Sequence, residues 1–138
     1  MSECYPVEML KSLGDNGIVG LTKINFKEVK MFHMLSCFNL KPELTIKEFQ
    51  CSLTLYKDHL IENNLLQNIG NIGKRNRHPV MDTDESNLEY FFIMTFKDLS
   101  QVEKSVEYVY SNSEAVASLH QDVFQKLDKY NFICWEDC

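Results

Sequence analysis

The chain has 138 residues, of which 44% are hydrophobic, and it carries 14 Lys and Arg against 20 Asp and Glu. This length suits one globular domain with its own core, and the net charge of −6 argues against a general nucleic-acid binder. No stretch approaches the roughly 18 apolar residues that a membrane span needs, and the N-terminus lacks the basic-then-apolar layout of a signal peptide. We therefore expect a cytoplasmic protein that binds neither nucleic acid nor membranes.

The first 30 residues form a separate piece. Pro6 to Leu13 predicts one or two helical turns, which end at the turn cluster of residues 14–17. Ile18 to Phe26 is apolar enough for a strand, but its hydrophobic period is mixed. We treat residues 1–30 as an N-terminal extension and expect the folded domain to occupy residues 31–138.

Sharper signals begin at Met31. Residues 31–39 predict a strand with apolar side chains on both faces, which Pro42 ends. Thr45 and Glu48 form a capping box, in which each side chain satisfies a free backbone N–H at the start of a helix. The helix carries a single apolar stripe, and Asn63-Asn64 marks its end. The stripe consists of Phe49, Leu53, Tyr56 and Leu60.

Two weaker segments separate this helix from the next strong strand. Gln67 to Arg77 predicts a strand interrupted by Gly70 and Gly73, and residues 78–87 predict a polar, exposed loop. The loop's acidic residues lack the spacing and the central glycine of a calcium loop.

The strand at residues 88–96 has large apolar groups on both faces. Successive side chains of a strand point to opposite faces, so Phe92 and Met94 lie on one face while Phe91 and Ile93 lie on the other. The protein's own helices can cover one face only. We expect a second copy of the chain to cover the other, which predicts a homodimer that buries more than roughly 1,200 Å² in total.

The C-terminal part predicts two helices and a last strand. Asp98 is the expected N-cap of a helix, Ser113 is the expected cap of a second one, and residues 129–136 form the strand. The first helix is expected to bury the face formed by Leu99, Val102, Val106 and Val109. The order from Met31 is a ferredoxin-like βαββαβ arrangement of class α+β, with a four-stranded antiparallel sheet, helices on one face and the second helix split in two.

Several short motifs carry a resemblance over residues 31–137. In these motifs the chain resembles the dimeric α+β barrel superfamily, and within it small uncharacterised ferredoxin-like proteins of marine bacteria. The superfamily includes cofactor-independent monooxygenases, polyketide cyclases, haem-degrading enzymes and stress-responsive proteins, so the resemblance implies a fold rather than one reaction. The matching motifs are Phe32-His33, Asn39-Leu40-Lys41-Pro42, Tyr56-Lys57-Asp58-His59-Leu60, Lys74-Arg75-Asn76-Arg77, Asp98-Leu99-Ser100-Gln101, Leu119-His120 and Phe132-Ile133-Cys134-Trp135-Glu136-Asp137.

Three histidines are candidate site residues. Some cyclases of the superfamily use a histidine at the position that corresponds to His33, so the resemblance implies that His33 is a general base, with His120 as its partner. A neutral imidazole suits proton abstraction at cytosolic pH. His59, on the first helix, is a candidate ligand-binding residue. The alternative for each is a hydrogen-bonded histidine that fills a seam of the core.

Other candidates are basic or aromatic. Arg75 lies in a cluster of positive charge and could bind an anion through its guanidinium fork, although basic groups also protect edge strands from aggregation. Tyr90 and Tyr130 could line a ligand pocket or belong to the core. The five cysteines are scattered and form no Cys-x-x-Cys pair, so we expect reduced thiols, no metal site and no cofactor.

Three functions remain open from the sequence. The first is a homodimeric domain that binds a small apolar or aromatic molecule and acts as a cofactor-free enzyme of the cyclase or monooxygenase kind. The second is a non-catalytic stress-responsive or assembly module. The third is a haem-binding variant. No sequence motif names a reaction.

Overall fold

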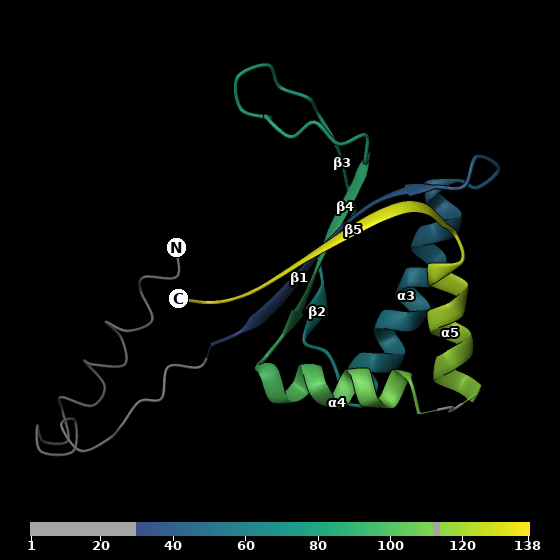
Figure 1. The fold of residues 1–138 in the computed structure, drawn as a ribbon. Coiled ribbons are helices and arrows are strands. Elements are labelled where there is room, and N and C mark those ends of the chain that lie inside the picture. Colours follow the sequence, from purple (N-terminus) through teal and green to yellow (C-terminus); the bar gives the residue numbers. More distant parts are fainter. Residues whose placement is uncertain (1–29, 112–113) are drawn as a thin grey trace, which may run out of the picture.

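The computed structural model describes residues 30–111 and 114–138, which form one antiparallel sheet with helices on one side (Figure 1). Residues 1–29 of the expected extension 1–30 and the expected cap at Ser113 lie outside the described residues. In chain order the elements are β1 (Phe32–Leu40), α3 (Ile46–Glu62), β2 (Asn68–Ile69), β3 (Gly73–Lys74), β4 (Tyr90–Phe96), α4 (Leu99–Val109), α5 (Glu114–Phe124) and β5 (Leu127–Glu136).

The sheet has the strand order β2-β4-β1-β5, and β3 pairs with β4 beside β2. All pairs are antiparallel, and Ser36 of β1 faces Phe92 of β4 on one side and Phe132 of β5 on the other. Since β2 and β3 share one edge of β4, they act as a single interrupted edge strand. The sheet thus has five strands where four were predicted, and the ferredoxin-like fold with a divided second helix is confirmed.

The interruption of that edge strand corrects the prediction for residues 67–77. Only residues 68–69 and 73–74 pair with β4, because the intervening segment turns away after Gly70, whose N–H donates to the Ile93 carbonyl oxygen over 2.9 Å. Arg75 and Arg77 consequently follow a strand that has already ended at Lys74. The predicted strand over residues 67–77 would have placed Arg75 and Arg77 on one face by alternation, and this consequence of the prediction is wrong.

Helix α3 begins and ends as its sequence predicts. The Glu48 N–H donates to Thr45 Oγ1 over 3.2 Å, and the Thr45 N–H donates to Glu48 Oε2 over 2.7 Å, which completes the capping box. Asn64, just past the end, has a φ of 58°, a left-handed conformation that stops a helix and that asparagine tolerates. The predicted apolar stripe is buried against the sheet and consists of Phe49, Leu53, Tyr56 and Leu60.

Helix α4 begins at the predicted cap, where the Gln101 N–H donates to Asp98 Oδ1 over 2.8 Å. Its expected buried face is only half confirmed: Val109 is buried and Val102 packs on the core, but Leu99 and Val106 are exposed. Gln101 and Ser105 are buried instead. The Gln101 side chain accepts from the Lys97 N–H and donates to the Asn64 carbonyl oxygen, so this polar residue is satisfied inside the protein.

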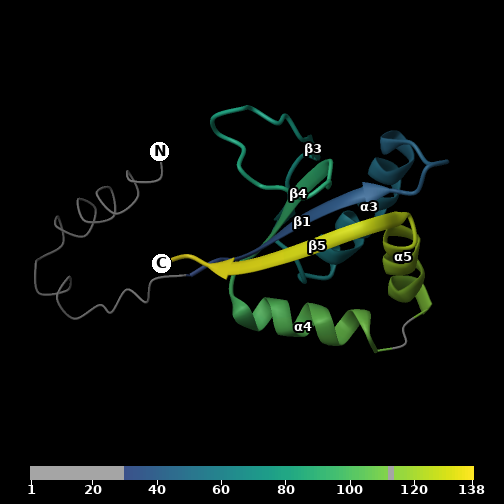
Figure 2. The ribbon, with the colours of Figure 1, turned by 45° about the horizontal axis from the view of Figure 1, so that its top comes forward.

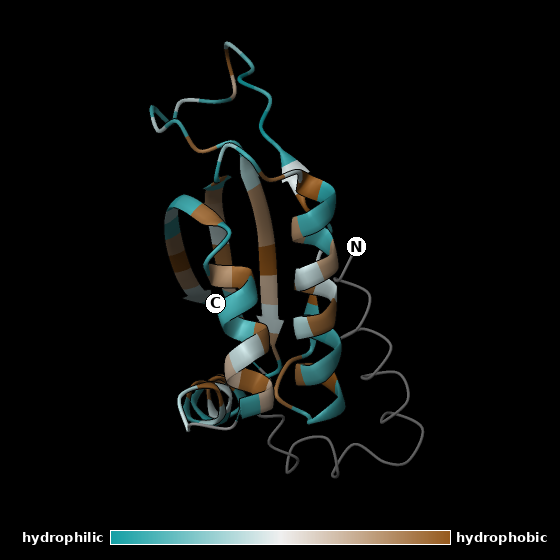
Figure 3. Cartoon of the chain, turned by 90° about the vertical axis from the view of Figure 1, so that its right-hand side faces the viewer, coloured by the Kyte–Doolittle hydropathy of each residue, from teal (hydrophilic) through white to brown (hydrophobic). Residues whose placement is uncertain are grey.

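The two faces of the sheet differ in what covers them. Figure 2 shows α3, α4 and α5 on the same side of the sheet, and in Figure 3 the hydrophobic residues of the strands lie behind these helices. The inner face carries Phe38 and Phe92, which pack with Phe49 at the centre of the core. No helix of the described ranges is both long enough and apolar enough to cross a membrane.

Candidate functional site

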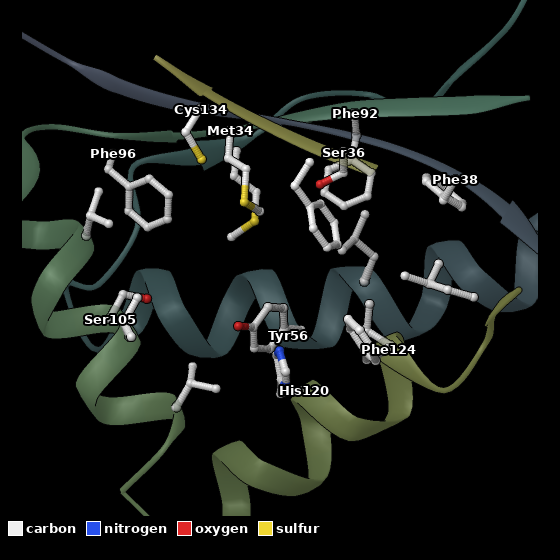
Figure 4. Close-up of a pocket in the computed structure, with 18 of the residues that line it drawn as sticks. Met34, Ser36, Phe38, Tyr56, Phe92, Phe96, Ser105, His120, Phe124 and Cys134 are labelled. Carbon is white, nitrogen blue, oxygen red and sulfur yellow. The ribbon is translucent and has the colours of Figure 1, made fainter. Parts of the chain in front are cut away.

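A cavity of about 360 Å³ lies between the inner face of the sheet and the three helices (Figure 4). Its size falls in the range of roughly 300–1,000 Å³ that is common for small-molecule sites. Strands β1, β4 and β5 supply one wall, and α3, α4 and α5 supply the other. Most of its lining is apolar, and Met34, Met94 and Cys134 stand side by side in register across the three strands.

The polar groups in this cavity are few. Ser36 enters from the sheet, Tyr56 from α3, Ser105 from α4 and His120 from α5. None of the described residues that line the cavity is Lys, Arg, Asp or Glu. A charged ligand would therefore lose its hydration without gaining an ionic partner, so the lining suits an uncharged molecule.

His120 belongs to an aromatic cluster on the helical wall. Its ring lies 5.6 Å from the ring of Tyr56, 6.0 Å from that of Tyr110 and 5.9 Å from that of Phe124, measured between centroids. Burial lowers the pKa of His120 below its usual value, because the apolar surroundings disfavour the imidazolium ion. At neutral pH this imidazole is uncharged and can accept a proton.

The pKa of Tyr56 is shifted in the opposite direction from that of His120. Burial, and to a lesser extent the nearby Tyr110, raises the pKa of Tyr56 well above its usual range, so its hydroxyl keeps its proton. A neutral imidazole and a permanently protonated phenol thus share one apolar cavity. This combination can remove a proton from a bound molecule and stabilise the oxyanion that results.

The cavity opens beside the edge strand β5. The exposed lining residues come from α5, from β5 and from α4 together with the residue that follows it, whereas the lining residues from β4 are buried. A ligand can therefore enter between the end of β5 and the two short helices. The exposed lining residues are Val106, Tyr110, Phe124, Phe132 and Cys134.

The structure does not bring His33 and His120 together. His33 lies on the outer face of the sheet, on the side away from the cavity, because its neighbours Phe32 and Met34 take the inner face. Its Nε2 lies 2.8 Å from Asp137 Oδ1, and its ring stacks on Trp135 with the centroids 5.2 Å apart. The hydrogen bond from His33 lowers the pKa of Asp137. In this arrangement His33 ties the C-terminal end of β5 to β1.

The other sequence candidates also lie outside the cavity lining. His59 Nε2 lies 3.1 Å from the Tyr108 hydroxyl, between α3 and α4. Tyr90 stacks on Phe38 at the far end of β4, and Tyr130 is 47% exposed and packs on Phe124 near the mouth. None of these three side chains lines the cavity, so their role as ligand-binding residues stays a prediction.

Arg75 organises the loop of residues 76–89 from inside. Its side chain is 3% exposed, and its Nε and Nη2 donate to the two carboxylate oxygens of Asp82, each over 2.7 Å. Its Nη1 donates to the Ser86 carbonyl oxygen over 2.7 Å, and Nη2 also donates to the Asp84 carbonyl oxygen. All three guanidinium nitrogens are thus bonded within the chain, in keeping with a structural role.

Metal-ligating residues do not cluster in the part of the chain that the structure describes: no group of three or more His, Cys, Asp or Glu side chains could hold an ion there. The four described cysteines are free thiols, and Cys4 lies outside the described residues.

The outer face of the sheet is a second notable surface. The residue pairs Leu35–Ile93, Leu35–Ile133 and Cys37–Phe91 are neighbours across the strands. Ile93 is 39% exposed and Ile133 is 51% exposed, and no helix of the described ranges covers them. We call this surface the outer apolar face, and it consists of Leu35, Phe91, Ile93, Ile133 and Trp135.

No protein-family model matches the chain, and no curated protein matches its sequence. Solved structures do match its fold. A hydroxynitrile lyase from Passiflora edulis is 11% identical, and the match covers 80% of this chain and 95% of the lyase with a TM-score of 0.57. A cofactor-independent oxygenase from Streptomyces nogalater is 6% identical over 78% of this chain and 91% of the oxygenase, with a TM-score of 0.53.

A third similar structure carries the name of the fold. A dabb family protein with a ferredoxin-like fold from Mesorhizobium loti is 16% identical over 77% of this chain and 95% of that protein, with a TM-score of 0.51. TM-scores above 0.5 show a common fold, whereas identities this low leave function open. The ferredoxin-like architecture is confirmed, while the nearer resemblance to proteins of marine bacteria stays a prediction.

Proposed function

We propose that this chain binds a small, uncharged and mostly apolar molecule in the inner cavity and transfers a proton on it without a cofactor. The observation that carries the proposal is the pairing of His120 with Tyr56 inside an apolar cavity. The two residues come from different helices and have pKa values shifted in opposite directions, and such pairs are typical of acid–base sites.

In this proposal His120 is the general base. Its lowered pKa leaves the imidazole uncharged at neutral pH, ready to take a proton from an acidic C–H or O–H group of the ligand. Tyr56 donates a hydrogen bond to the oxygen on which negative charge develops. The apolar walls exclude water, which strengthens that hydrogen bond.

Two of the solved structures that share this fold are enzymes by name. One is a lyase and one is an oxygenase, so this fold hosts catalysis in other proteins. Sites rather than folds determine the reaction, so the support for this chain comes from the cavity. His33 has no part in the proposal, because it lies across the sheet from His120.

Deuterium exchange into an aromatic ketone tests the proposal. In buffered D₂O, 2-tetralone exchanges its acidic C–H protons slowly, and NMR follows the loss of their signal. We expect the protein to accelerate this exchange and His120→Gln to abolish the acceleration. His59→Gln is the matched control, because His59 also contacts a tyrosine but does not line the cavity.

The pH dependence identifies the base. A base works in its neutral form, so the protein-catalysed rate should rise with pH and then level off. Because burial lowers the pKa of His120, the midpoint of this rise should lie below the value of about 6.5 that an ordinary histidine shows. Equal loss of activity in the His59 and His120 variants, or no exchange above the buffer rate, would contradict the proposal.

We also propose a homodimer that forms through the outer apolar face. Soluble monomers rarely expose a contiguous apolar patch of this kind, and the chain's helices already occupy the other side of the sheet. A second copy presents the same apolar surface, so a two-fold axis through the face buries both patches at once.

A further inference from the structure

Ser36 is a polar residue in an apolar setting. It lies in the middle of β1 on the inner face, and its cross-strand neighbours are Phe92 and Phe132. Its exposed fraction is 2%, and its hydroxyl lines the cavity beside Met34 and Phe38.

The Ser36 hydroxyl has no hydrogen-bond partner. Among residues 30–111 and 114–138, its Oγ is the only buried side-chain nitrogen or oxygen atom without a hydrogen-bond partner. Ser52 shows the usual arrangement, because this buried serine donates to Asp122 Oδ2 over 2.7 Å. An unpaired buried hydroxyl destabilises a protein, and such a group therefore calls for an explanation.

The residues around Ser36 indicate which kind of ligand could bond its hydroxyl. Phe38, Phe92 and Phe96 provide aromatic walls, and the row of Met34, Met94 and Cys134 provides polarisable sulfur atoms that favour contact with aromatic rings. No described residue of the lining carries a permanent charge. These walls fit a neutral aromatic ring.

We infer that Ser36 is a specificity-determining residue whose hydroxyl bonds a hydroxyl or carbonyl group of a neutral aromatic ligand. The inference rests on the proposed function only in placing the ligand in the same cavity. Ser36 anchors the polar substituent from the sheet, so the ring lies against the sulfur row and faces Tyr56 and His120 across the cavity. A hydrocarbon of the same shape would leave the Ser36 hydroxyl unpaired and would bind less tightly.

Two probes that differ by one hydroxyl test this role. Titrations follow the fluorescence of 1-naphthol and of naphthalene with the wild-type protein, Ser36→Ala and Ser52→Ala. The wild type should prefer 1-naphthol, and Ser36→Ala should weaken 1-naphthol binding about three- to tenfold while leaving naphthalene binding unchanged, the effect of losing one hydrogen bond. Ser52→Ala should keep the wild-type preference.

Stability provides a second readout. Ser36→Ala should unfold at the same denaturant concentration as the wild type or a higher one, because it removes an unpaired hydroxyl, whereas Ser52→Ala should unfold at a lower one. If Ser36→Ala weakens both probes equally, or leaves the preference intact, the role of Ser36 is overturned while the cavity remains a binding site. If the wild type binds neither probe, the proposed function falls as well.

Discussion

Replacing Ile93 with glutamate should convert a dimer into a monomer. Ile93 belongs to the outer apolar face, where it neighbours Leu35 of the central strand β1. A two-fold interface would bring two such glutamates into an apolar contact, where each carboxylate would be buried without a partner. We expect the dissociation constant of the dimer to rise by several orders of magnitude, as measured by sedimentation equilibrium at micromolar concentration.

Leu55→Glu is the matched control. Leu55 is 58% exposed on α3, away from the outer apolar face, so the same change there should leave the dimer intact. A wild-type protein that is monomeric at micromolar concentration would contradict the homodimer. Dimerisation that appears only when residues 1–29 are removed would identify those residues as the cover of the face, and would also contradict it.

Arg75→Met should release the loop of residues 76–89 without affecting the cavity. The substitution keeps the length of the side chain but removes all the guanidinium hydrogen bonds to Asp82, Asp84 and Ser86. Hydrogen exchange measured by mass spectrometry should show fast exchange in this loop and wild-type protection in α3. Arg77→Met is the control, because Arg77 is half-exposed and makes a single ion pair, with Glu89, among the described residues.

Acid should reproduce part of this effect. The hydrogen bond from Arg75 lowers the pKa of Asp82, and Ser86 and Arg75 lower the pKa of Asp84. A carboxylate with a lowered folded-state pKa stabilises the fold above its unfolded pKa, and this contribution is lost as the pH falls through the folded value. The protection of the loop's backbone amides from hydrogen exchange should therefore decrease below about pH 4, where Asp becomes protonated. Unchanged protection in Arg75→Met would contradict the account of Arg75.

The sequence predicted best those elements whose signals are local. The capping box at Thr45 and the alternation around Phe92 depend on neighbouring residues only, and both are confirmed. The buried face of α4 was not predictable in this way. Gln101 turns inward because it bonds the Asn64 carbonyl, 37 residues away, and hydrophobic periodicity gives no sign of such a partner.

The candidate site was harder to predict than the fold. His120 was selected from the sequence and lines the cavity, but its expected partner His33 takes the opposite face, as alternation with Met34 requires. Tyr56 fits the apolar stripe of α3, so the sequence gives no separate signal for the role that we propose for it. Ser36 offers one local signal, a small polar residue between Met34 and Phe38 on an apolar strand face, although only the structure shows that its hydroxyl is unpaired.

The central claim is that a small apolar molecule occupies the inner cavity, and methionine methyl groups report on this directly. Met34 and Met94 line the cavity, whereas Met81 is 77% exposed in the loop after β3. In protein labelled with ¹³C at the methionine methyl groups, bound 1-naphthol should give nuclear Overhauser contacts to Met34 and Met94 and none to Met81. Contacts confined to Met81, or no contact with either cavity methionine at saturating 1-naphthol, would contradict the claim.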